Sequence, residues 1–421
     1  MTNIRRHERT LLLIAGVIML NGILAVSLTL GSVDYNIIGT TCGLVISFIF
    51  VNALLHKAGH AGDPLLLPLA ALLAGIGLTT ILRLKPNLFL LQAMWIGIGL
   101  LCFLISAFIA RRLEQIAKFK YVCGFIGISL LLSAILFGTD IGGNKNWVIL
   151  GPIRFQPSEF AKMFIVLFLA AYLSERRELL TLATRHYGPL VLPHPRFIAP
   201  LIAVWGLGMM MFILQRDMGA ALLYFGIAII MTYMVSGRLS YIVIGLILFL
   251  IGSLLCYKLY SHIQTRVDIW LNPWADPNGN AYQIVQSLFA FGSGGIMGSG
   301  LTYGFPGMIP EVHTDFIFSA IGEEMGLMVA GAVIIIYIIM VYRAFRAALL
   351  STMPFSILVA GGLSASMALQ IFLIIGGVTK FFPLTGITLP FISYGGSSIV
   401  ANFILLGMLF AISEVRSYDA K

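Results

Sequence analysis

The residues best suited to chemistry lie where a polar segment meets an apolar one, between Glu311 and Glu324. The segment is polar through Asp315, turns apolar at Phe316, and then carries Glu323 beside Glu324. Ionisable groups inside a membrane-spanning helix cost on the order of a few kcal/mol each, so they are functional candidates by default. We interpret Asp315 as a reactive carboxylate at a membrane surface. The two glutamates, about 12–14 Å deeper along one continuous helix, are predicted to pair with polar groups inside the bundle.

Asp315 also has a simpler interpretation as the N-cap of the helix that follows it. A side-chain cap of this kind contributes about 1 kcal/mol to helix stability and needs no chemistry. The two roles remain open at this point.

A second set of charged residues opens another apolar run. Arg154 lies shortly before Pro157, and Glu159 and Lys162 then share one face of the predicted helix at i, i+3. An ion pair near a helix end is the simpler interpretation of these two residues. Pairing and ligand binding are compatible, because a lysine that balances a glutamate can also face a phosphate.

Two further polar segments lie between apolar runs. Arg216 and Asp217 form a tight turn, and a solvated turn is the usual explanation for such a pair. Ser397 belongs to a segment rich in Gly, Ser and Pro, residues 383–398. Small residues there allow close helix packing, or they line a re-entrant wall of a cavity, where protein or water covers the backbone.

Composition identifies the class of protein. The mean hydropathy is +0.98, 59% of residues are hydrophobic and 10% are charged, whereas soluble domains carry about 25% charged residues. The chain is therefore predicted to be a polytopic membrane protein. Its four cysteines are scattered without a CxxC pair or a Cys/His cluster, so neither disulfides nor a zinc site is predicted. No basic module typical of nucleic-acid binding accompanies the net charge of +9.

Twelve apolar runs are long enough to cross a bilayer, which predicts an all-α, polytopic membrane helix bundle of about 10–12 transmembrane helices. The runs fall near residues 10–31, 36–54, 64–83, 88–110, 119–138, 158–175, 197–215, 218–235, 240–260, 316–342, 355–378 and 392–413. We treat 1–421 as a single integral membrane domain with three parts. These are the N-terminal spans (1–138), a core (139–260 and 316–413) and a large extracytoplasmic loop (261–315).

The basic residues predict the orientation. With the N-terminus in the cytoplasm, 17 Lys and Arg residues lie inside and 8 lie outside, and Lys162 lies within a span. This bias supports cytoplasmic N- and C-termini under the positive-inside rule. The candidate residues then gather on the outer side. The loop 261–315 is longer than a connector requires and carries Trp270, Trp274 and an amphipathic stretch near 281–289, which predicts an interfacial and binding role.

Several short motifs have residues and an order along the chain that are similar to those of one known family. The chain resembles the SEDS family (shape, elongation, division and sporulation proteins of the RodA and FtsW type) in Gln156-Pro157-Ser158-Glu159, Asn272-Pro273-Trp274, His313-Thr314-Asp315-Phe316-Ile317-Phe318 and Pro390-Phe391-Ile392-Ser393-Tyr394-Gly395-Gly396-Ser397-Ser398. These motifs are spread over residues 140–410. Gln215-Arg216-Asp217-Met218-Gly219 departs from the common Gln-Pro-Asp pattern and resembles the RodA-like branch more than FtsW.

The resemblance implies a peptidoglycan glycosyltransferase that polymerises lipid II at the outer face of the bacterial cytoplasmic membrane, for cell shape or division. It also implies a class B penicillin-binding protein as partner. Asp315 matches the family's essential aspartate, and Glu159 and Lys162 match its cavity-lining pair. The candidate catalytic residue is therefore Asp315, and the candidate substrate-binding residues are Glu159, Lys162, Arg154, Arg216, Asp217, His313 and Ser397.

Glycan polymerisation needs a base for the acceptor hydroxyl and positive charge for the departing pyrophosphate. Asp315 is the predicted base, Lys162, Arg154 and Arg216 the predicted cations, and Glu159 orients Lys162. A divalent cation such as Mg²⁺ or Mn²⁺ is compatible with this chemistry, but nothing in the sequence demands one.

Two rival classes use the same residues. A lipid-precursor flippase or ion-coupled transporter would place its polar sites near the bilayer midplane, with access from both faces. The polar groups of this chain gather instead in the predicted outer third, which favours an outward-facing enzyme. A non-catalytic membrane scaffold for a cell-wall partner is the third interpretation.

Overall fold

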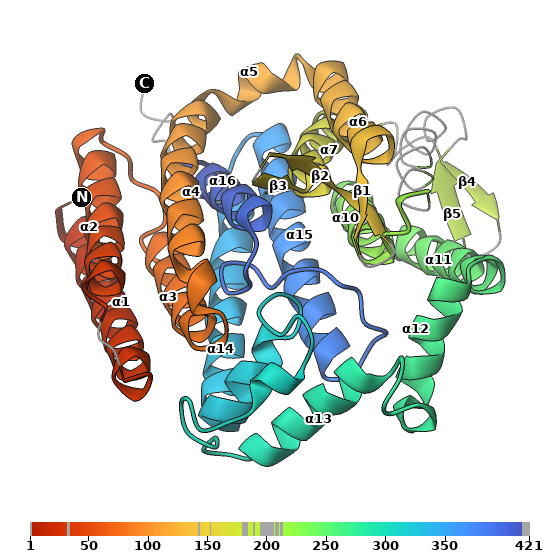
Figure 1. Cartoon of the computed structure of the whole chain (residues 1–421). Coiled ribbons are helices and arrows are strands. Elements are labelled where there is room, and N and C mark those ends of the chain that lie inside the picture. The colour runs from red at the N-terminus through yellow and green to blue at the C-terminus, as the bar shows by residue number, and fades with distance from the viewer. Residues whose placement is uncertain are drawn as a thin grey trace. The chain divides into compact units, whose positions relative to one another are not determined.

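Helices dominate the structure, as the sequence predicts. The computed structural model describes residues 2–31, 34–141, 144–151, 153–178, 184–187, 190–193, 206, 210 and 214–414 (Figure 1). Within this described part, ten helices are long and apolar enough to cross a membrane, and the apolar α16 (Gly396–Ile412) is slightly shorter. The all-α, multi-pass fold class is thus confirmed. The predicted run 197–215 lies almost wholly outside the described residues.

Eleven described helices correspond to predicted apolar runs. They are α1 (Thr2–Thr29), α2 (Tyr35–Lys57), α3 (Leu66–Leu84), α4 (Phe89–Ile109), α6 (Lys120–Phe137), α7 (Pro157–Glu175), α10 (Met218–Ser236), α11 (Leu239–Leu259), α14 (Ile317–Leu350), α15 (Pro354–Val378) and α16. Shorter helical segments connect them: η1 (Pro86–Leu88), η2 (Ala110–Arg112), α5 (Leu113–Ala117), α12 (Ser261–Leu271), η3 (Pro273–Ala275), α13 (Tyr282–Gly294) and η4 (Pro306–Met308).

Two small antiparallel sheets interrupt the helices. The strands β1 (Thr139–Ile141), β2 (Asn144–Leu150) and β3 (Ile153–Phe155) pair in the order β1-β2-β3, with Val148 opposite Phe155. The strands β4 (Thr184–Tyr187) and β5 (Leu190–Pro193) form a separate hairpin. The first sheet leads directly into α7, so it determines where Arg154 on β3 lies relative to the start of that helix.

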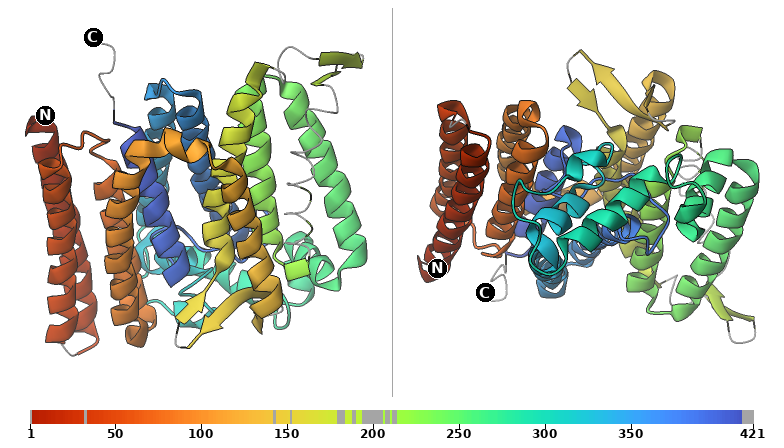
Figure 2. Two further views of the ribbon diagram at one scale, coloured as in Figure 1. Left: turned by 90° about the horizontal axis from the view of Figure 1, so that it is seen from above. Right: turned by 60° about the horizontal axis from the view of Figure 1, so that its bottom comes forward.

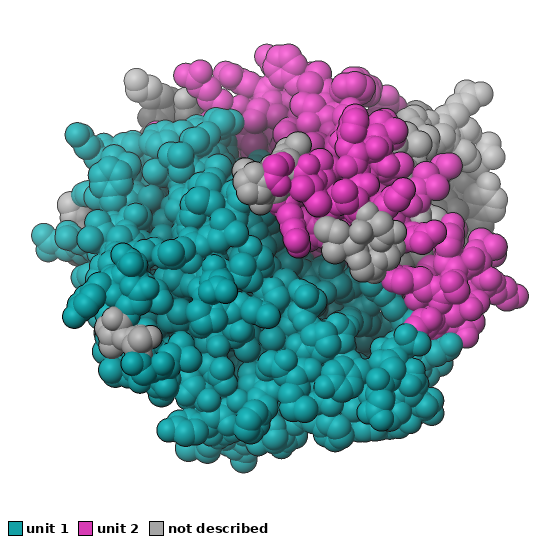
Figure 3. Space-filling model, viewed as in Figure 1, with its two compact units in different colours: residues 1–110, 266–346, 370–421 teal, residues 111–265, 347–369 magenta. Residues whose placement is uncertain are grey.

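The chain divides into two compact units (Figure 3). Unit 1 comprises residues 1–110, 266–346 and 370–421, and unit 2 comprises residues 111–265 and 347–369. Unit 1 therefore holds α1 to α4, α13, most of α14 and α16. Unit 2 holds α6, α7, α10, α11 and the first sheet.

Small residues allow the helices of unit 1 to approach closely. The first two helices, α1 and α2, run side by side (Figure 2), and α1 also packs on α3. A Cβ on Gly77 of α3 would lie 2.5 Å from the carbonyl oxygen of Ile392. A Cβ on Gly99 of α4 would lie 2.4 Å from the ring of Phe403 in α16. Only glycine allows these contacts, which bring α3 and α4 against the C-terminal segment.

The long α14 is broken, which corrects the predicted continuous helix. Gly326 has φ 75° and ψ 179°, far from helical values. The backbone groups released by the break bond to the segment after α13. Ser299 N and Gly300 N donate to the carbonyls of Glu323 and Glu324 at 2.9 and 3.0 Å, and Leu327 N donates to Gly295 O at 3.0 Å. Because these bonds replace helical ones, the break leaves the freed groups satisfied. Glu323 and Glu324 therefore do not lie on one straight helix with the span that follows.

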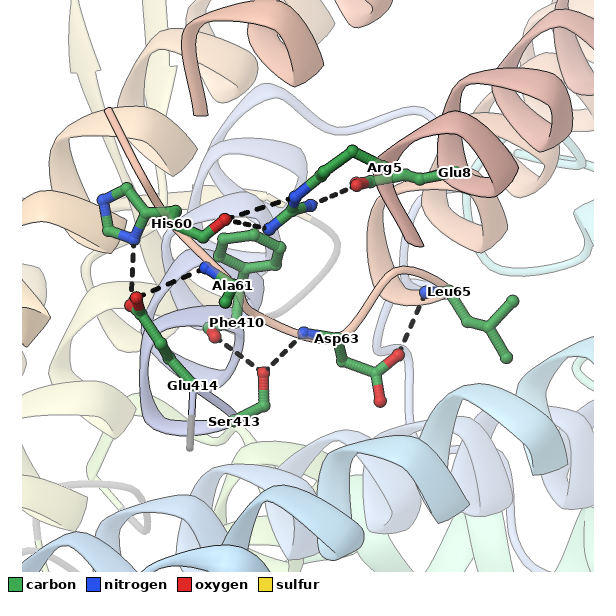
Figure 4. A network of polar contacts seen from close by, with 9 residues as sticks. All are labelled: Arg5, Glu8, His60, Ala61, Asp63, Leu65, Phe410, Ser413 and Glu414. Atoms are coloured by element: carbon green, nitrogen blue, oxygen red, sulfur yellow. Dashed lines mark hydrogen bonds and ion pairs between the residues drawn. The ribbon is translucent and has the colours of Figure 1, made fainter. Parts of the chain in front are cut away.

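Polar and charged residues join three chain segments of unit 1 (Figure 4). Arg5 pairs with Glu8 and donates to the carbonyl of His60 at 2.7 Å. The His60 ring lies 3.2 Å from Glu414 Oε2, and Asp63 N donates to Ser413 Oγ at 2.8 Å. The loop between α2 and α3 thus ties the beginning of α1 to the end of α16.

The same loop also contacts α14, since Arg343 Nη2 lies 2.6 Å from Asp63 Oδ2. Breaking a buried ion pair by removing one partner costs about 3–5 kcal/mol. Because the Arg343 side chain is 17% exposed, Asp63→Asn should cost about 3 kcal/mol, the lower end of that range. The expected result is a clearly lower melting temperature of the detergent-solubilised protein.

The control for this prediction is Glu175→Gln, which removes the 54% exposed partner of Lys120. Exposed pairs contribute about 0–1 kcal/mol, so this variant should melt close to the wild type. Equal melting temperatures for Asp63→Asn and wild type would show that the Asp63–Arg343 pair does not hold unit 1 together.

Candidate active site

Asp315 lies in a compact turn that precedes α14. Glu311 has a positive φ of 53°, and Thr314 folds back on it through N and Oγ1, which donate to Glu311 O at 3.0 and 2.8 Å. The helix begins at Ile317, and the carbonyl of Phe316 accepts bonds from Ser319 N and Ala320 N. Phe316 therefore occupies the N-cap position, and Asp315 lies one residue before it. The N-cap interpretation of Asp315 is not what the structure shows.

The turn that carries Asp315 is bound to the segment before α16. Tyr394 N donates to His313 O at 2.9 Å, and Ser393 Oγ donates to Thr314 O at 2.6 Å. The rings of His313 and Tyr394 also lie 5.7 Å apart between centroids. Two motifs separated by about 80 residues thus form one joint, and Asp315 follows directly on the two carbonyls that this joint holds.

Arg266 is a neighbour of Asp315 that sequence reasoning missed. Arg266 Nη1 donates to the carbonyls of Leu384 and Thr385 at 3.1 and 3.3 Å. Gly386 follows with φ 69°, and a Cβ built on it would lie 3.6 Å from Asp315 Oδ2 and 3.7 Å from Arg266 Nη2. The carboxylate and the guanidinium therefore flank the same glycine. The available signal was the position of Arg266 in the long loop, six residues before the Asn-Pro-Trp motif.

The geometry of Glu159 and Lys162 in unit 2 confirms the predicted ion pair. Pro157 is the first residue of α7, and Lys162 Nζ lies 2.7 Å from Glu159 Oε2 one turn later. Lys162 is 2% exposed and Glu159 is 8% exposed. A buried pair of this kind needs further hydrogen bonds to offset its desolvation. Both charges are thus held in place near the beginning of the helix.

The turn before α10 positions Asp217. This residue is the N-cap of α10, where its side chain accepts from Ala220 N at 3.0 Å and from Asn146 Nδ2 at 2.9 Å. The second bond joins the turn to β2. Arg216 has φ 59° and is exposed, and Arg154 on β3 is also exposed. The buried Asp217 therefore holds the turn, and the arginine beside it faces outward.

The remaining candidates are buried in unit 1. Ser397 lies in the first turn of α16 and is 6% exposed. Glu323 accepts from Phe305 N at 2.8 Å, and Glu324 accepts from Arg83 Nε at 3.0 Å. The prediction that these two glutamates pair with polar groups is confirmed. The break at Gly326 separates them from the long span that follows.

The described residues include no group of three His, Cys, Asp or Glu side chains that could hold a metal ion. Asp315 belongs to unit 1, whereas Glu159, Lys162, Asp217, Arg154 and Arg216 belong to unit 2. Each unit thus carries its own cluster of candidate residues.

Comparison with known proteins identifies the family. The FtsW/RodA/SpoVE family of cell cycle proteins matches residues 69–418. This chain belongs to that family. The peptidoglycan glycosyltransferase RodA of Mycobacterium tuberculosis (strain ATCC 25618 / H37Rv) is 40% identical over 393 residues, which cover 89% of this chain and 83% of that protein. The stage V sporulation protein E of Bacillus subtilis is 31% identical over 299 residues, 70% of this chain and 78% of that one.

Solved structures agree with this assignment. A chain of a peptidoglycan synthase complex, in a study of how polymerization and crosslinking are coordinated, is 26% identical with a TM-score of 0.71. The rod shape determining protein RodA of Thermus thermophilus is 25% identical with a TM-score of 0.60. Both matches cover 85% of this chain and 99% of the other chain. The family match begins at residue 69, so α1 and α2 precede it.

His313 adds a pH dependence to the joint. Burial lowers the pKa of His313 below its ordinary value of 6.5, Glu311 opposes this shift, and Lys85 adds to it. The unfolded chain then binds a proton on His313 in a pH range where the folded protein does not. Stability is therefore full above the ordinary pKa and is lost as the pH falls through it toward the folded value.

The expected result is that the wild-type melting temperature falls relative to that of His313→Gln as the pH is lowered from about 7.5 to about 5.5. Both proteins would be followed by thermal unfolding in the same detergent across this range. A constant difference between the two melting temperatures would contradict the lowered pKa of His313.

Proposed function

We propose that this peptidoglycan glycosyltransferase polymerises lipid II into glycan strands with Asp315 as its general base. The observation that carries the proposal is the placement of Asp315: a half-buried carboxylate one residue before the N-cap position of α14, which flanks Gly386 together with the Arg266 guanidinium. Its backbone is held by the Ser393–Tyr394 joint, and a guanidinium lies beside it. Such a group is placed for proton transfer rather than for helix stability.

The reaction assigns a role to each charge. Asp315 takes the proton of the acceptor sugar hydroxyl as its oxygen bonds to the donor's anomeric carbon. The bond from that carbon to the lipid pyrophosphate breaks, and the pyrophosphate leaves with the electron pair. Fixed positive charge at the leaving group lowers this barrier because the cations need no rearrangement during the reaction. Lys162, Arg154 and Arg216 are the proposed cations, and Arg266 is a further one close to the base.

The proposal assigns supporting roles to the other candidate residues. Glu159 holds Lys162 in place and Asp217 holds the turn that presents Arg216, and His313 and Ser397 are further proposed substrate-binding residues. Asp315 is the carboxylate that would contribute to holding a Mg²⁺ or Mn²⁺ ion, although the described residues place no group of three His, Cys, Asp or Glu side chains around it. The ion would supply additional positive charge where the leaving group develops its own negative charge.

The proposed location is the cytoplasmic membrane of a bacterium, with both termini in the cytoplasm. The bias of Lys and Arg supports this orientation. The contacts of the loop between α2 and α3 add support from the structure, because Arg5 near the N-terminus and Glu414 near the C-terminus both bond to His60. These contacts support a location of both termini on the same side of the membrane. Asp315 then faces the outer surface, where lipid II is consumed.

A class B penicillin-binding protein is the proposed partner, since a polymerised strand must be cross-linked. Support comes from the similar chain in the peptidoglycan synthase complex that couples polymerization and crosslinking. Exposed apolar side chains on the loop after α13 offer a docking surface for such a partner: Ile296, Met297, Tyr303, Phe305 and Met308.

Asp315→Asn should abolish the reaction because the amide cannot accept the hydroxyl proton. General-base catalysis contributes about 10²- to 10⁴-fold, so we expect a loss in that range with little change in melting temperature. Glycan strands formed by purified protein from lipid II in detergent would be separated on a gel. No translocation step occurs in this assay, so it also distinguishes an enzyme from a flippase.

The matched control is Asp34→Asn, since Asp34 is an exposed N-cap on α2. It should lose some stability but keep its polymerase activity. Strand synthesis by Asp315→Asn at the wild-type rate would remove Asp315 as the base, whereas a wild-type protein that makes no strands in this assay would favour the scaffold or transport interpretation.

Gly386→Ala tests the space between Asp315 and Arg266. A methyl group there would touch both charged atoms at ordinary contact distance and would exclude substrate or water from between them. The control, Gly237→Ala, has a similar φ of 64° with nothing within 4 Å of the added methyl. Both variants bear the cost of a left-handed conformation, about 1–2 kcal/mol. We expect only Gly386→Ala to lose polymerase activity, about tenfold or more. Equal activity of the two variants would contradict a functional contact at Gly386.

A further inference from the structure

Gln92 is a buried amide in α4 whose two polar atoms both bind the same turn. Its side chain is 1% exposed. Nε2 donates to Ser393 O at 3.1 Å, and Oε1 accepts from Gly395 N at 3.3 Å. One side chain thus bonds to the backbone on both sides of Tyr394. A primary amide supplies a donor and an acceptor on two separate atoms without a charge, so it can bond to an N–H and a C=O at the same time.

The backbone just before the turn that Gln92 holds is strained. Phe391 has φ 66°, a left-handed conformation that costs a non-glycine residue of order 1–3 kcal/mol and persists only when its surroundings hold it. Ser393 Oγ accepts from Leu389 N at 2.9 Å, and the Phe391 ring packs on Phe403 with centroids 5.2 Å apart. Other bonds secure the beginning of this segment, including Tyr337 Oη to Pro390 O at 2.5 Å. Gln92 adds the bonds to Ser393 O and Gly395 N, which lie on the two sides of Tyr394.

A short series of bonds leads from Gln92 to Asp315. Gln92 holds Ser393 O and Gly395 N, Ser393 Oγ donates to Thr314 O, and Tyr394 N donates to His313 O. Thr314 and His313 are the two residues before Asp315. All of these groups belong to unit 1. The position of the Asp315 carboxylate therefore depends on α4, a helix that contributes no group to the proposed reaction.

We propose that Gln92 is a positioning residue for the Asp315 base, an inference that rests on the proposed function. It keeps the turn 393–395 in the conformation that presents Ser393 Oγ and Tyr394 N to the loop before Asp315. Loss of the amide leaves Ser393 O and Gly395 N buried without their partner, so the turn shifts to find others. A displacement of about 1 Å at a catalytic group costs up to about 10²-fold in rate. The effect falls on the chemical step rather than on substrate binding.

Two substitutions separate positioning from simple stabilisation. Gln92→Met keeps the size of the side chain but has neither donor nor acceptor, so its kcat should fall about tenfold or more with a KM for lipid II near the wild-type value. The effect of Gln92→Glu on activity depends on whether the new carboxyl group is protonated. A protonated carboxyl donates to Ser393 O and accepts from Gly395 N as the amide does, whereas an ionised carboxylate cannot donate.

The activity of Gln92→Glu relative to wild type should therefore be high at acidic pH and fall as the pH is raised. Taking the ratio at each pH removes the titration of Asp315, which both proteins share. Gln92→Met should show a low ratio at every pH. A merely structural role of Gln92 predicts a lower melting temperature for both variants and no pH-dependent ratio of activities per folded molecule.

The matched control is Ser106→Ala in the same helix. Ser106 is buried and its hydroxyl bonds within α4, to Phe103 O at 2.9 Å, without contacting the turn. This variant should keep the wild-type kcat and pH profile. Measuring Asp315→Asn in the same assay keeps the two claims separate. If Asp315→Asn stays active, the proposed base is wrong whatever Gln92 does.

If Asp315→Asn is inactive while Gln92→Met retains the wild-type kcat, the positioning role alone is overturned. Should Gln92→Met not be recovered as folded protein, Gln92→Glu decides the question. A ratio that falls with rising pH supports the proposal, and a flat ratio overturns it.

Discussion

The joint between the His313–Asp315 turn and the Ser393–Gly395 turn is the interaction on which the site depends. Neither turn has regular secondary structure, so neither can satisfy its backbone within itself. The two turns bond to each other, because Ser393 Oγ donates to Thr314 O and Tyr394 N donates to His313 O. Gln92 then bonds to Ser393 O and Gly395 N of the second turn. Irregular backbone is tolerated next to a membrane only under this condition. The same condition makes the position of Asp315 well defined.

The break in α14 follows the same rule at a second place. Gly326 interrupts the helix, and the glycine-rich segment after α13 supplies the bonds that the helix loses. Glycine at residue 298 is required there, because a Cβ would lie 2.4 Å from the carbonyl oxygen of Glu324. The break separates the Asp315 turn and the short helical piece after it from the long span. A site at the end of a broken helix is thus held by its neighbours rather than by the span alone.

Buried charge in the described residues is mostly paired over short distances. Glu159 pairs with Lys162, Glu324 with Arg83, and Asp63 with Arg343. An unpaired charge in such surroundings would cost several kcal/mol, so each pair is expected from physics once the burial is known. The first pair joins residues one helical turn apart and could be predicted from spacing. The other two join residues far apart in the chain, and no local pattern indicates them.

The sequence by itself determined the class of the protein, the membrane helices and the motif residues. Hydropathy is averaged over consecutive residues, and the i, i+3 spacing of Glu159 and Lys162 lies within one helical turn. Both properties are local, so the sequence alone predicts them. Tertiary structure decided the rest: the position of Asp315 before the N-cap, the break at Gly326, and the neighbourhood of Arg266 and Gln92. The break at Gly326 and the neighbourhoods of Arg266 and Gln92 depend on contacts between residues 24 to 303 positions apart, as in Gln92 and Ser393, which are 301 apart. Contacts of that kind form only when the helices pack. Periodicity and composition do not specify which distant segment will bond to a backbone group that lacks a local partner.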